Sequence, residues 1–227
     1  LVFRKNFIRT YLERDIPQFG FRIPAETLRR FWTMLAHSQG GLLNASCLAT
    51  GLSVSVPTIT KYVDLLVDLL LVRRLPPFHT NMGKRQIKSP KLYVRDSGLL
   101  HALLDLETYS ALSGHPVVGG SYEGFVIEQL LSLLPYQSQA SFYRSAGGAE
   151  IDLLIELPKQ AGRWAIEIKR GLRARPDKGF YHAIETVAPS QCFVVYAGQE
   201  RYKIADKVEA ISLYELMTLL KQVLSQQ

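Results

Sequence analysis

Residues 149–155, Ala-Glu-Ile-Asp-Leu-Leu-Ile, and residues 164–169, Trp-Ala-Ile-Glu-Ile-Lys, are two short apolar segments that predict β-strands. Side chains alternate between the two faces of a strand, so Glu167 and Lys169 share one face while the isoleucines beside them point into a core. If the two strands are neighbours, Asp152 joins that face. Two carboxylates and one ammonium would then meet at one place, and carboxylate oxygens are ligands that a hard divalent cation prefers.

Each of these features has an ordinary structural explanation. A Glu-x-Lys pair on a half-exposed strand is usually a solvated face of the sheet. Asp152 is harder to explain in this way, because an ionised carboxylate among buried aliphatic residues is costly unless it is paired or bound to a metal. The pair of segments therefore indicates a site more strongly than either segment alone.

The surrounding sequence predicts a defined order of elements. An amphipathic helix precedes the two strands, a further strand and a Gly147-Gly148 turn lie between helix and Asp152, and a helix and a strand follow. These elements are expected at residues 120–131, 141–144, 176–187 and 192–196.

This order, with acidic residues on the helix and on two strands, resembles the PD-(D/E)xK nuclease fold over roughly residues 121 to 200. The resemblance implies an α-β-β-β-α-β core that holds Mg²⁺ or Mn²⁺ and cuts phosphodiester bonds. Carried over by position, the metal ligands are Glu123 (with Glu128 as the alternative), Asp152 and Glu167, and Lys169 assists the attacking water. Ile151 stands where the Pro of the motif would be, which lowers the specificity of the match.

Composition limits the classes of protein that remain. The chain has 227 residues, a formal net charge of +7 and 47% hydrophobic residues, which is long enough for two modest soluble domains. The longest apolar stretch, residues 62–72, carries two aspartates, so no membrane span and no membrane partner are expected. No signal-peptide pattern opens the chain, and Cys47 and Cys192 have no metal-ligand spacing. A cytoplasmic protein with two free thiols is expected.

The positive charge is concentrated in the first part of the chain. Residues 1–100 hold fifteen Lys or Arg and six Asp or Glu, a net of +9, whereas residues 101–227 hold twelve and fourteen, a net of −2. A basic module is typical of proteins that contact phosphate-rich partners, although a generic basic surface would give the same count.

The first part of the chain predicts a winged helix-turn-helix. Helices are expected at 24–38, at 44–52 between an Asn44 cap and a Gly51 stop, and from a Ser55 cap onward. Strands at 71–75 and 91–94 would form the wing.

The wing and its surroundings are the expected contacts to DNA, with a plain protein-interaction module as the alternative. The third helix carries Asp64 and Asp68, so contact should run mainly through phosphates rather than base edges. Lys91 is expected in the hairpin loop as a further phosphate contact, Arg95 flanks that loop, and Arg175 accompanies the basic run after the third nuclease strand. The residues expected to contact nucleic acid are Lys61, Arg73, Arg74, Lys84, Arg85, Lys88, Arg170, Arg173 and Lys178.

Taken together, these motifs resemble the C-terminal region of prokaryotic AAA-type ATPases. The most specific pieces are Lys-Leu-Tyr-x-x-Asp-x-Gly-Leu at residues 91–99 and the Asp…Glu-x-Lys set. The resemblance implies four parts: a remnant or linker after the ATPase core at 1–20, the winged helix-turn-helix at 21–98, a connecting helix and loop at 99–120, and the nuclease-like domain at 121–227.

No P-loop occurs in this chain, so ATP would be bound only by the absent ATPase domain. A start at Leu rather than Met agrees with a fragment of a longer protein, whose own ATPase domain would be one partner. The sequence does not fix the oligomeric state, and the resemblance allows a homo-oligomer, since nuclease domains of this kind often pair.

Two functions from different classes follow. The first is a metal-dependent endonuclease that the basic wing brings to DNA. The second is a catalytically inactive nuclease-like module that binds nucleic acid or protein and regulates the ATPase.

Overall fold

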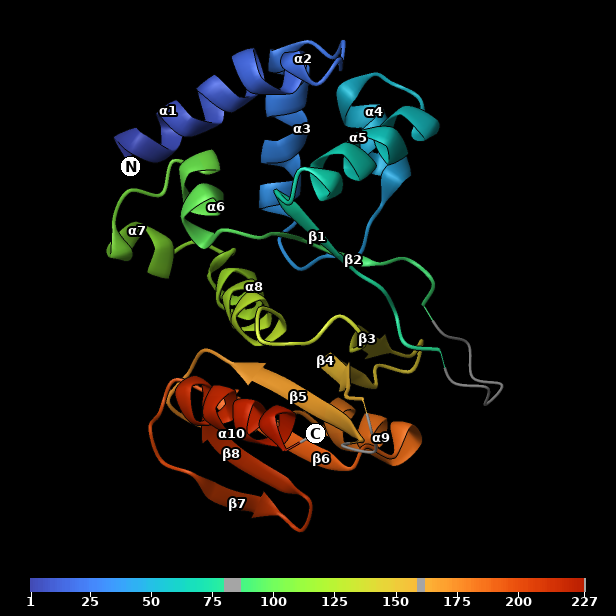
Figure 1. The fold of residues 1–227 in the computed structure, drawn as a ribbon, viewed down its shortest axis with the longest axis vertical. Helices are drawn as coiled ribbons and strands as arrows, with labels where there is room; N and C mark the ends of the chain where they lie inside the picture. The colour runs from blue at the N-terminus through green and yellow to red at the C-terminus, as the bar shows by residue number, and fades with distance from the viewer. Residues whose placement is uncertain (80–86, 159–161, 227) are drawn as a thin grey trace. The chain divides into compact units, whose positions relative to one another are not determined.

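The computed structural model describes residues 1–79, 87–158 and 162–226. They form two compact units, which do not simply follow one another along the chain: residues 1–74 and 91–125 make the first unit, and residues 75–90 and 126–227 make the second. Figure 1 follows their elements from the N-terminus to the C-terminus. Mixed α/β architecture, as expected, results from a helical first unit and a second unit built on a sheet.

The first unit is a set of helices with one two-stranded sheet, β1–β2. Its strands fall where the sequence predicts the wing, and its third to fifth helices fall within two residues of the predicted boundaries. The elements are α1 (Val2–Thr10), the π-helical turn η1 (Tyr11–Asp15), α2 (Ile16–Gln18), α3 (Ala25–His37), α4 (Ala45–Leu52), α5 (Val56–Asp68), β1 (Val72–Leu75), β2 (Lys91–Val94), α6 (Ser97–Leu103), α7 (Tyr109–Ser113) and the first part of α8 (Val118–Leu131).

The expected helix caps are made. Asn44 accepts a hydrogen bond from the N–H of Cys47 at 3.0 Å, and Ser55 accepts one from the N–H of Thr58 at 3.3 Å. The expected stop at Gly51 is wrong, because α4 runs to Leu52 and Ser53 takes the left-handed conformation. A Cβ at Gly51 would lie 2.6 Å from Cε of Met34, so this glycine allows close packing of α4 on α3.

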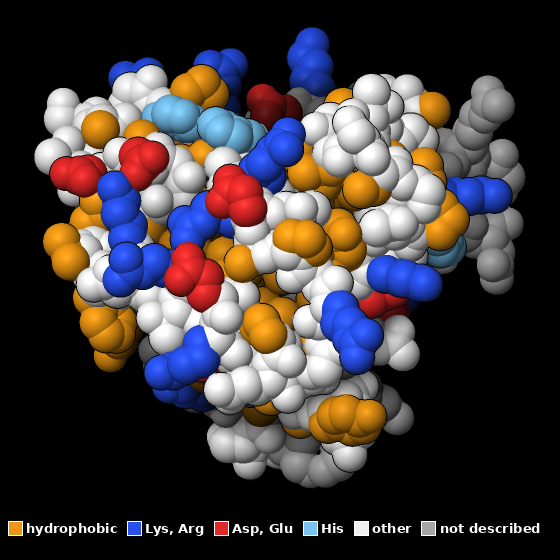
Figure 2. All heavy atoms as spheres, turned by 90° about the horizontal axis from the view of Figure 1, so that it is seen from above, with side chains coloured by type: hydrophobic (Ala, Val, Ile, Leu, Met, Phe, Trp, Pro, Cys, Tyr) orange, Lys and Arg blue, Asp and Glu red, His pale blue; other side chains and the backbone are white. Residues whose placement is uncertain are grey.

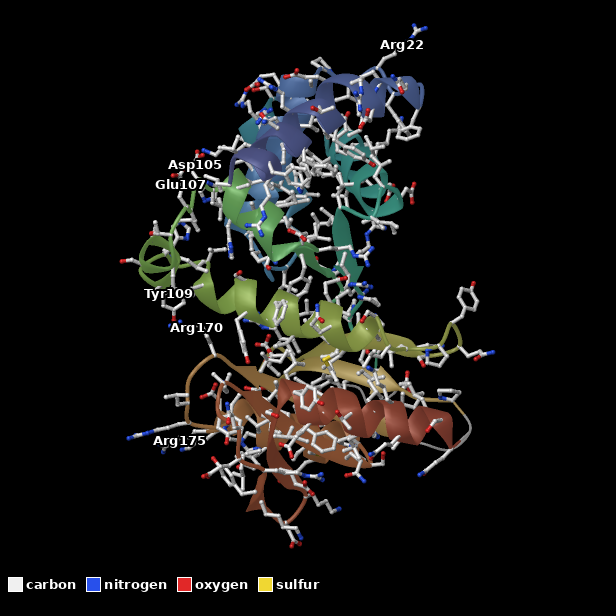
Figure 3. The ribbon with its side chains drawn as sticks, turned by 60° about the vertical axis from the view of Figure 1, so that its left-hand side comes forward. Arg22, Asp105, Glu107, Tyr109, Arg170 and Arg175 are labelled. Carbon is white, nitrogen blue, oxygen red and sulfur yellow. The ribbon has the colours of Figure 1, made fainter. Side chains whose placement is uncertain are left out.

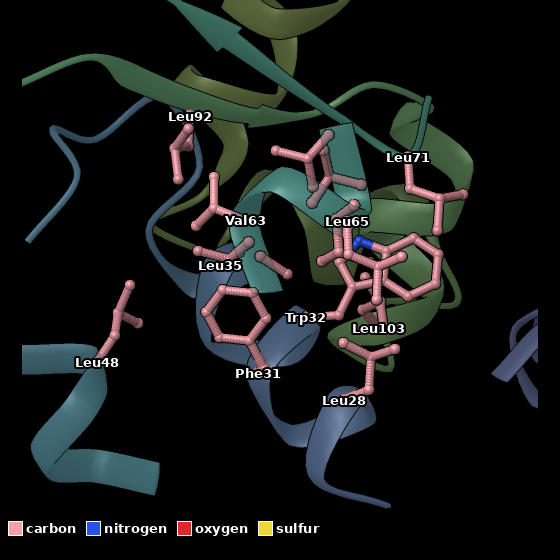
Figure 4. Packing of buried hydrophobic residues seen from close by; sticks show 14 of the residues in the cluster. Leu28, Phe31, Trp32, Leu35, Leu48, Val63, Leu65, Leu71, Leu92 and Leu103 are labelled. Atoms are coloured by element: carbon pink, nitrogen blue, oxygen red, sulfur yellow. The ribbon is translucent and has the colours of Figure 1, made fainter. Parts of the chain in front are cut away.

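One hydrophobic cluster forms the core of the first unit. Figure 4 shows α3 contributing Phe31, Trp32 and Leu35, with Val63 of α5 and Leu92 of β2 packed beside them. Residues 2–18, within the segment expected as a remnant or linker, are helical and place Ile8, Leu12 and Ile16 in the same core.

The second unit is built on a six-stranded sheet of order β3-β4-β5-β6-β8-β7. Neighbouring strands run antiparallel from β3 to β5 and from β8 to β7, and parallel from β5 to β8. The predicted order of helix, three strands, helix and strand is present. The elements after the end of α8 are β3 (Gln139–Arg144), β4 (Glu150–Glu156), β5 (Arg163–Lys169), α9 (Lys178–Val187), β6 (Gln191–Tyr196), β7 (Tyr202–Ala205), β8 (Val208–Ser212) and α10 (Leu213–Ser225).

Helices cover the sheet of the second unit on both faces. Phe180 and Ala183 of α9 pack in one cluster with Leu154 of β4 and Ala165 of β5, which marks the face that α9 covers. Helix α10 lies across the opposite face (Figure 1). No helix among residues 1–79, 87–158 and 162–226 is long and apolar enough to cross a membrane.

The segment that leaves β1 is paired with the sheet of the second unit. The N–H of Phe142 in β3 donates to the carbonyl of Pro76 at 3.0 Å, and the N–H of Phe78 donates to the carbonyl of Phe142. Further along, the N–H of Ile87 lies 3.4 Å from the carbonyl of Arg144. Both described ends of the wing loop are therefore held along the edge of β3.

Candidate functional site

Asp152 and Glu167 are brought together by the pairing of β4 with β5. The strands pair antiparallel with Leu153 opposite Ile166. The regular pairing ends at Leu153 and Ile166, so Asp152 and Glu167 are the next residues on two adjacent strands. The expected adjacency of the two strands is confirmed.

Asp152 lies at an irregularity of β4. Ser141 of β3 pairs with Leu154 and Tyr143 pairs with Ile151, so two steps along β3 correspond to three along β4. The extra residue is a β-bulge, which re-aims the side chain next to it. Oδ2 of Asp152 accepts a hydrogen bond from the N–H of Ile168 at 2.9 Å, so the carboxylate is turned toward β5.

Glu167 is buried beside a charged partner. Its side chain is 7% exposed, and its Oε1 lies 2.8 Å from Nζ of Lys169. Burial raises the pKa of Glu167, and the hydrogen bond from Lys169 offsets this in part. Ala165 belongs to the cluster under α9, so alternation along β5 puts Glu167 and Lys169 on that same face.

Asp177 is a member of this site that the sequence analysis did not include. Its Oδ2 lies 2.7 Å from Nζ of Lys169, so the ammonium is held between two carboxylates. Burial lowers the pKa of Lys169, but the hydrogen bonds to Asp177 and Glu167 outweigh it and raise the pKa overall. Lys169 therefore stays protonated at neutral pH.

The position of Asp177 at the start of α9 carries the signal that could have identified it. An Asp before a helix normally caps it by accepting from a backbone N–H of the first turn. Asp177 is the N-cap residue of α9 but makes no side-chain cap hydrogen bond, because its carboxylate is directed to Lys169. The sequence shows the cap residue but not that its carboxylate turns away from the helix.

A close backbone approach fixes where α9 begins. A Cβ at Gly179, in the first turn of α9, would lie 2.4 Å from the carbonyl oxygen of Gly148 in the turn before β4. Any larger residue would push the helix away from that turn. Gly179 therefore sets the distance between Asp177 and the two central strands.

Glu123, the expected third acidic residue, is engaged inside the first unit. Its Oε1 accepts from Nζ of Lys91 at 3.1 Å and from the hydroxyl of Tyr93 at 2.6 Å. These partners are the Lys and Tyr of the Lys-Leu-Tyr motif, so part of that motif holds α8 to β2. The alternative, Glu128, lies on α8 and is half-buried.

The residues expected to contact nucleic acid fall into four groups. Lys61, Lys88, Arg170, Arg173 and Lys178 are exposed, Arg73 is half-buried, and Lys84 and Arg85 lie outside the described residues. Arg74 is bonded to Asp64 of α5. On the face drawn in Figure 2, Lys and Arg side chains are scattered and interspersed with acidic ones.

Lys91 contradicts the expectation of phosphate contact. Its side chain is only 5% exposed because it is paired with Glu123. Counting basic residues around the wing therefore overstates the charge that a phosphate could reach.

A divalent cation would find two carboxylates here rather than a closed cage. No group of three or more His, Cys, Asp or Glu that could hold a metal ion occurs in the parts of the chain that the structure describes. Mg²⁺ usually keeps several waters and is bound through one or two carboxylates. Asp152 and Glu167 fit that donor set, since both supply oxygen and no softer ligand lies among the site residues.

Comparisons with known proteins add relatives without an assigned function. The uncharacterized protein Rv2008c of Mycobacterium tuberculosis and the uncharacterized protein Mb2031c of Mycobacterium bovis are each 42% identical over 216 residues, which is 95% of this chain and 48% of theirs. The chain thus spans about half the length of the curated relatives it matches. No solved structure matches it. Two family models match parts of the chain: a domain of unknown function, DUF8612, at residues 1–110, and a domain of unknown function, DUF4143, at residues 118–216.

Proposed function

We propose that the second unit is a PD-(D/E)xK nuclease-like domain that binds DNA and hydrolyses its phosphodiester bonds with a divalent cation. The observation that carries the proposal is the pairing of β4 with β5, in which Asp152 accepts from the N–H of Ile168, the residue between the ion-paired Glu167 and Lys169. Glu167 and Lys169 follow Asp152 by fifteen and seventeen residues along the chain. The pairing of β4 with β5 brings the two segments together. An Asp at a bulge and a buried Glu are poor choices for a purely structural surface.

Asp152 and Glu167 would hold Mg²⁺ or Mn²⁺. A bound cation supplies positive charge next to the phosphate and acidifies a coordinated water. Because burial raises the pKa of Glu167, a cation competes with a proton for this carboxylate more than it would at an ordinary Glu. Cation binding should therefore tighten as the pH rises through that pKa.

Lys169 would act as a fixed positive charge. Because its pKa is raised, Lys169 is already protonated at neutral pH and cannot accept a proton from water. It therefore serves as a hydrogen-bond donor rather than as a base. Glu167 and Asp177 hold the ammonium in place before substrate arrives. Such preorganised charge stabilises the transition state more than a mobile side chain would.

The first unit would be a winged helix-turn-helix that positions the protein on DNA. α4 and α5 would supply the helix pair and β1–β2 the wing, and Lys61 and Lys88 are exposed. Lys84 and Arg85, which lie outside the described residues, remain predicted phosphate contacts. In a full-length protein the whole assembly would be cytoplasmic, would work beside an ATPase domain that binds ATP, and would pair with a second copy.

One observation favours a second function, a catalytically inactive regulatory module. The ammonium of Lys169 is already bonded to two carboxylates, and the described residues hold no third metal ligand at the site. A closed ion-pair network of this kind suits a binding arm as well as an enzyme.

Cleavage assays separate the two functions. The purified chain should cut DNA with Mg²⁺ or Mn²⁺ and stop when EDTA is added. Asp152→Asn and Glu167→Gln should lower the rate by orders of magnitude, as expected for loss of a ligand. Glu209→Gln, which removes a carboxylate from an ion pair on β8, is the matched control and should cut normally. Equal cutting by the wild type and by Asp152→Asn would mean that the activity belongs to a contaminant.

A further inference from the structure

The loop between β5 and α9 presents an unusual run of side chains beside the site. Residues 170–178 directly follow Lys169 and contain four basic residues and one acidic residue, Asp177, which is bonded to Lys169. All four basic side chains are exposed: Arg170, Arg173, Arg175 and Lys178. Figure 3 labels Arg170 and Arg175 on this loop and shows Arg175 extending into the open.

Leu172 stands in the middle of this basic run. It is 77% exposed, although a leucine gains stability from burial. The loop around it is anchored: the carbonyl of Gly171 accepts from the N–H of Ala197 at 3.1 Å, and Ala174 is buried in the core of the second unit. Leu172 is therefore held outward by a fixed backbone and does not serve the core.

We propose that this loop binds nucleic acid whose bases are already unstacked, with the arginines on phosphates and Leu172 against the face of a base. The inference rests on the proposed function and names the substrate class: single-stranded or junction DNA rather than intact duplex. Basic side chains supply affinity for phosphates without regard to sequence. Apolar side chains that insert between bases must first unstack them, and a single strand has no such cost to meet.

The loop carries the two kinds of side chain, basic and apolar, that proteins use to bind single-stranded nucleic acid. Grooves for single strands combine positive charge along the backbone with flat or apolar side chains against the bases. Arginine guanidinium groups also stack on bases, so Arg170 and Arg173 on either side of Leu172 extend the same surface. No carboxylate among the described residues is bonded to these four cations, which leaves them available to phosphates.

Binding can be measured without cleavage. Fluorescence anisotropy in EDTA would compare a labelled single strand with a blunt duplex of the same length, using the full chain. The wild type should bind the single strand more tightly. Leu172→Ser should weaken single-strand binding roughly three- to tenfold and leave duplex binding unchanged. Arg173→Ala should weaken binding to both and lower the salt slope by about one.

Two control variants match these changes elsewhere on the second unit. Tyr214→Ser removes an 80% exposed apolar side chain from α10, and Lys221→Ala removes one exposed positive charge from the same helix. Neither should alter single-strand preference. Equal affinity of the wild type for both DNAs, or an effect of Leu172→Ser no larger than that of Tyr214→Ser, would overturn the inference.

The outcome is independent of catalysis. Single-strand preference in EDTA together with no cutting in Mg²⁺ would support the loop and reject the nuclease. Cutting in Mg²⁺ with equal affinity for both DNAs would support the nuclease and reject the loop.

Discussion

Replacing Lys169 with Met tests whether the ammonium compensates the buried charge of Glu167. Met keeps an unbranched side chain of similar length and removes the charge that lies 2.8 Å from Oε1 of Glu167. At that distance two unit charges attract by about 6 kcal/mol at an effective dielectric constant near 20 and by about 1.5 kcal/mol in bulk water. Because 26% of the Lys169 side chain is exposed, solvent screening places the loss of unfolding free energy nearer the lower bound, at about 2 to 3 kcal/mol.

This loss should depend on pH with a definite sign. Burial raises the pKa of Glu167, so the folded chain holds that proton more strongly than the unfolded chain. The resulting stability is complete below the ordinary pKa of Glu and is lost as the pH rises through the raised value. Without Lys169 the pKa of Glu167 rises further. The gap between wild type and Lys169→Met should therefore be small in acid and grow toward neutral pH.

Tryptophan fluorescence can follow the second unit alone. The chain has two tryptophans, Trp32 in the first unit and Trp164 on β5. Urea unfolding in a Trp32→Phe background, measured from pH 5 to pH 8, reports the strand that carries Glu167. Adding Glu167→Gln to Lys169→Met should restore most of the loss, since the uncompensated charge is gone. A loss that is constant with pH, or that simply adds in the double variant, would refute the reasoning.

Three shorter predictions concern the rest of the site. Glu123→Gln should destabilise the first unit, because it leaves the buried ammonium of Lys91 without this ion pair, and unfolding followed by Trp32 fluorescence should register roughly 1 to 3 kcal/mol; loss of cleavage at unchanged stability would instead assign Glu123 to catalysis. Gly179→Ala should lower the melting temperature, since its Cβ would meet a backbone oxygen at 2.4 Å that cannot swing away, whereas Gly147→Ala, which has room, should not. Mn²⁺ affinity, measured by calorimetry, should rise with pH through the raised pKa of Glu167 and lose most of that dependence in Glu167→Gln.

Alternation along the strands was enough to predict the two central strands and their pairing. Apolar residues around Glu167 identify β5, and the segment around Asp152 identifies β4, but the bulge at Asp152 interrupts the period of two in β4 and no local pattern reports it. The contribution of Asp177 could not be read in the same way. It depends on how closely α9 approaches the turn at Gly148, which is a tertiary contact that Gly179 permits and no local pattern reports.

The wing shows a different limit of sequence reasoning. Lys91 and Arg74 count as basic residues in the sequence. In the structure Lys91 is bonded to Glu123 of α8, and Arg74 is bonded to Asp64 of α5. A count of charges cannot tell a paired cation from a free one. The sequence did not predict that Pro76 and Phe78 pair with β3. Two consecutive prolines predict the end of a strand, but they do not predict what the following segment contacts.

The ion pair of β5 raises the question of why a buried charge is present at all. Replacing a buried ion pair with apolar side chains of similar volume is often neutral or stabilising by about 1 to 4 kcal/mol. A Glu167→Met/Lys169→Met double variant should therefore unfold at the same urea concentration as the wild type or a higher one, while Lys169→Met alone unfolds earlier. Asp177 does not oppose this, because its side chain is 81% exposed and can be hydrated. A double variant that is at least as stable would mean that the charges serve binding or chemistry, and one that loses several kcal/mol would make them part of the scaffold and remove the main support for a catalytic site.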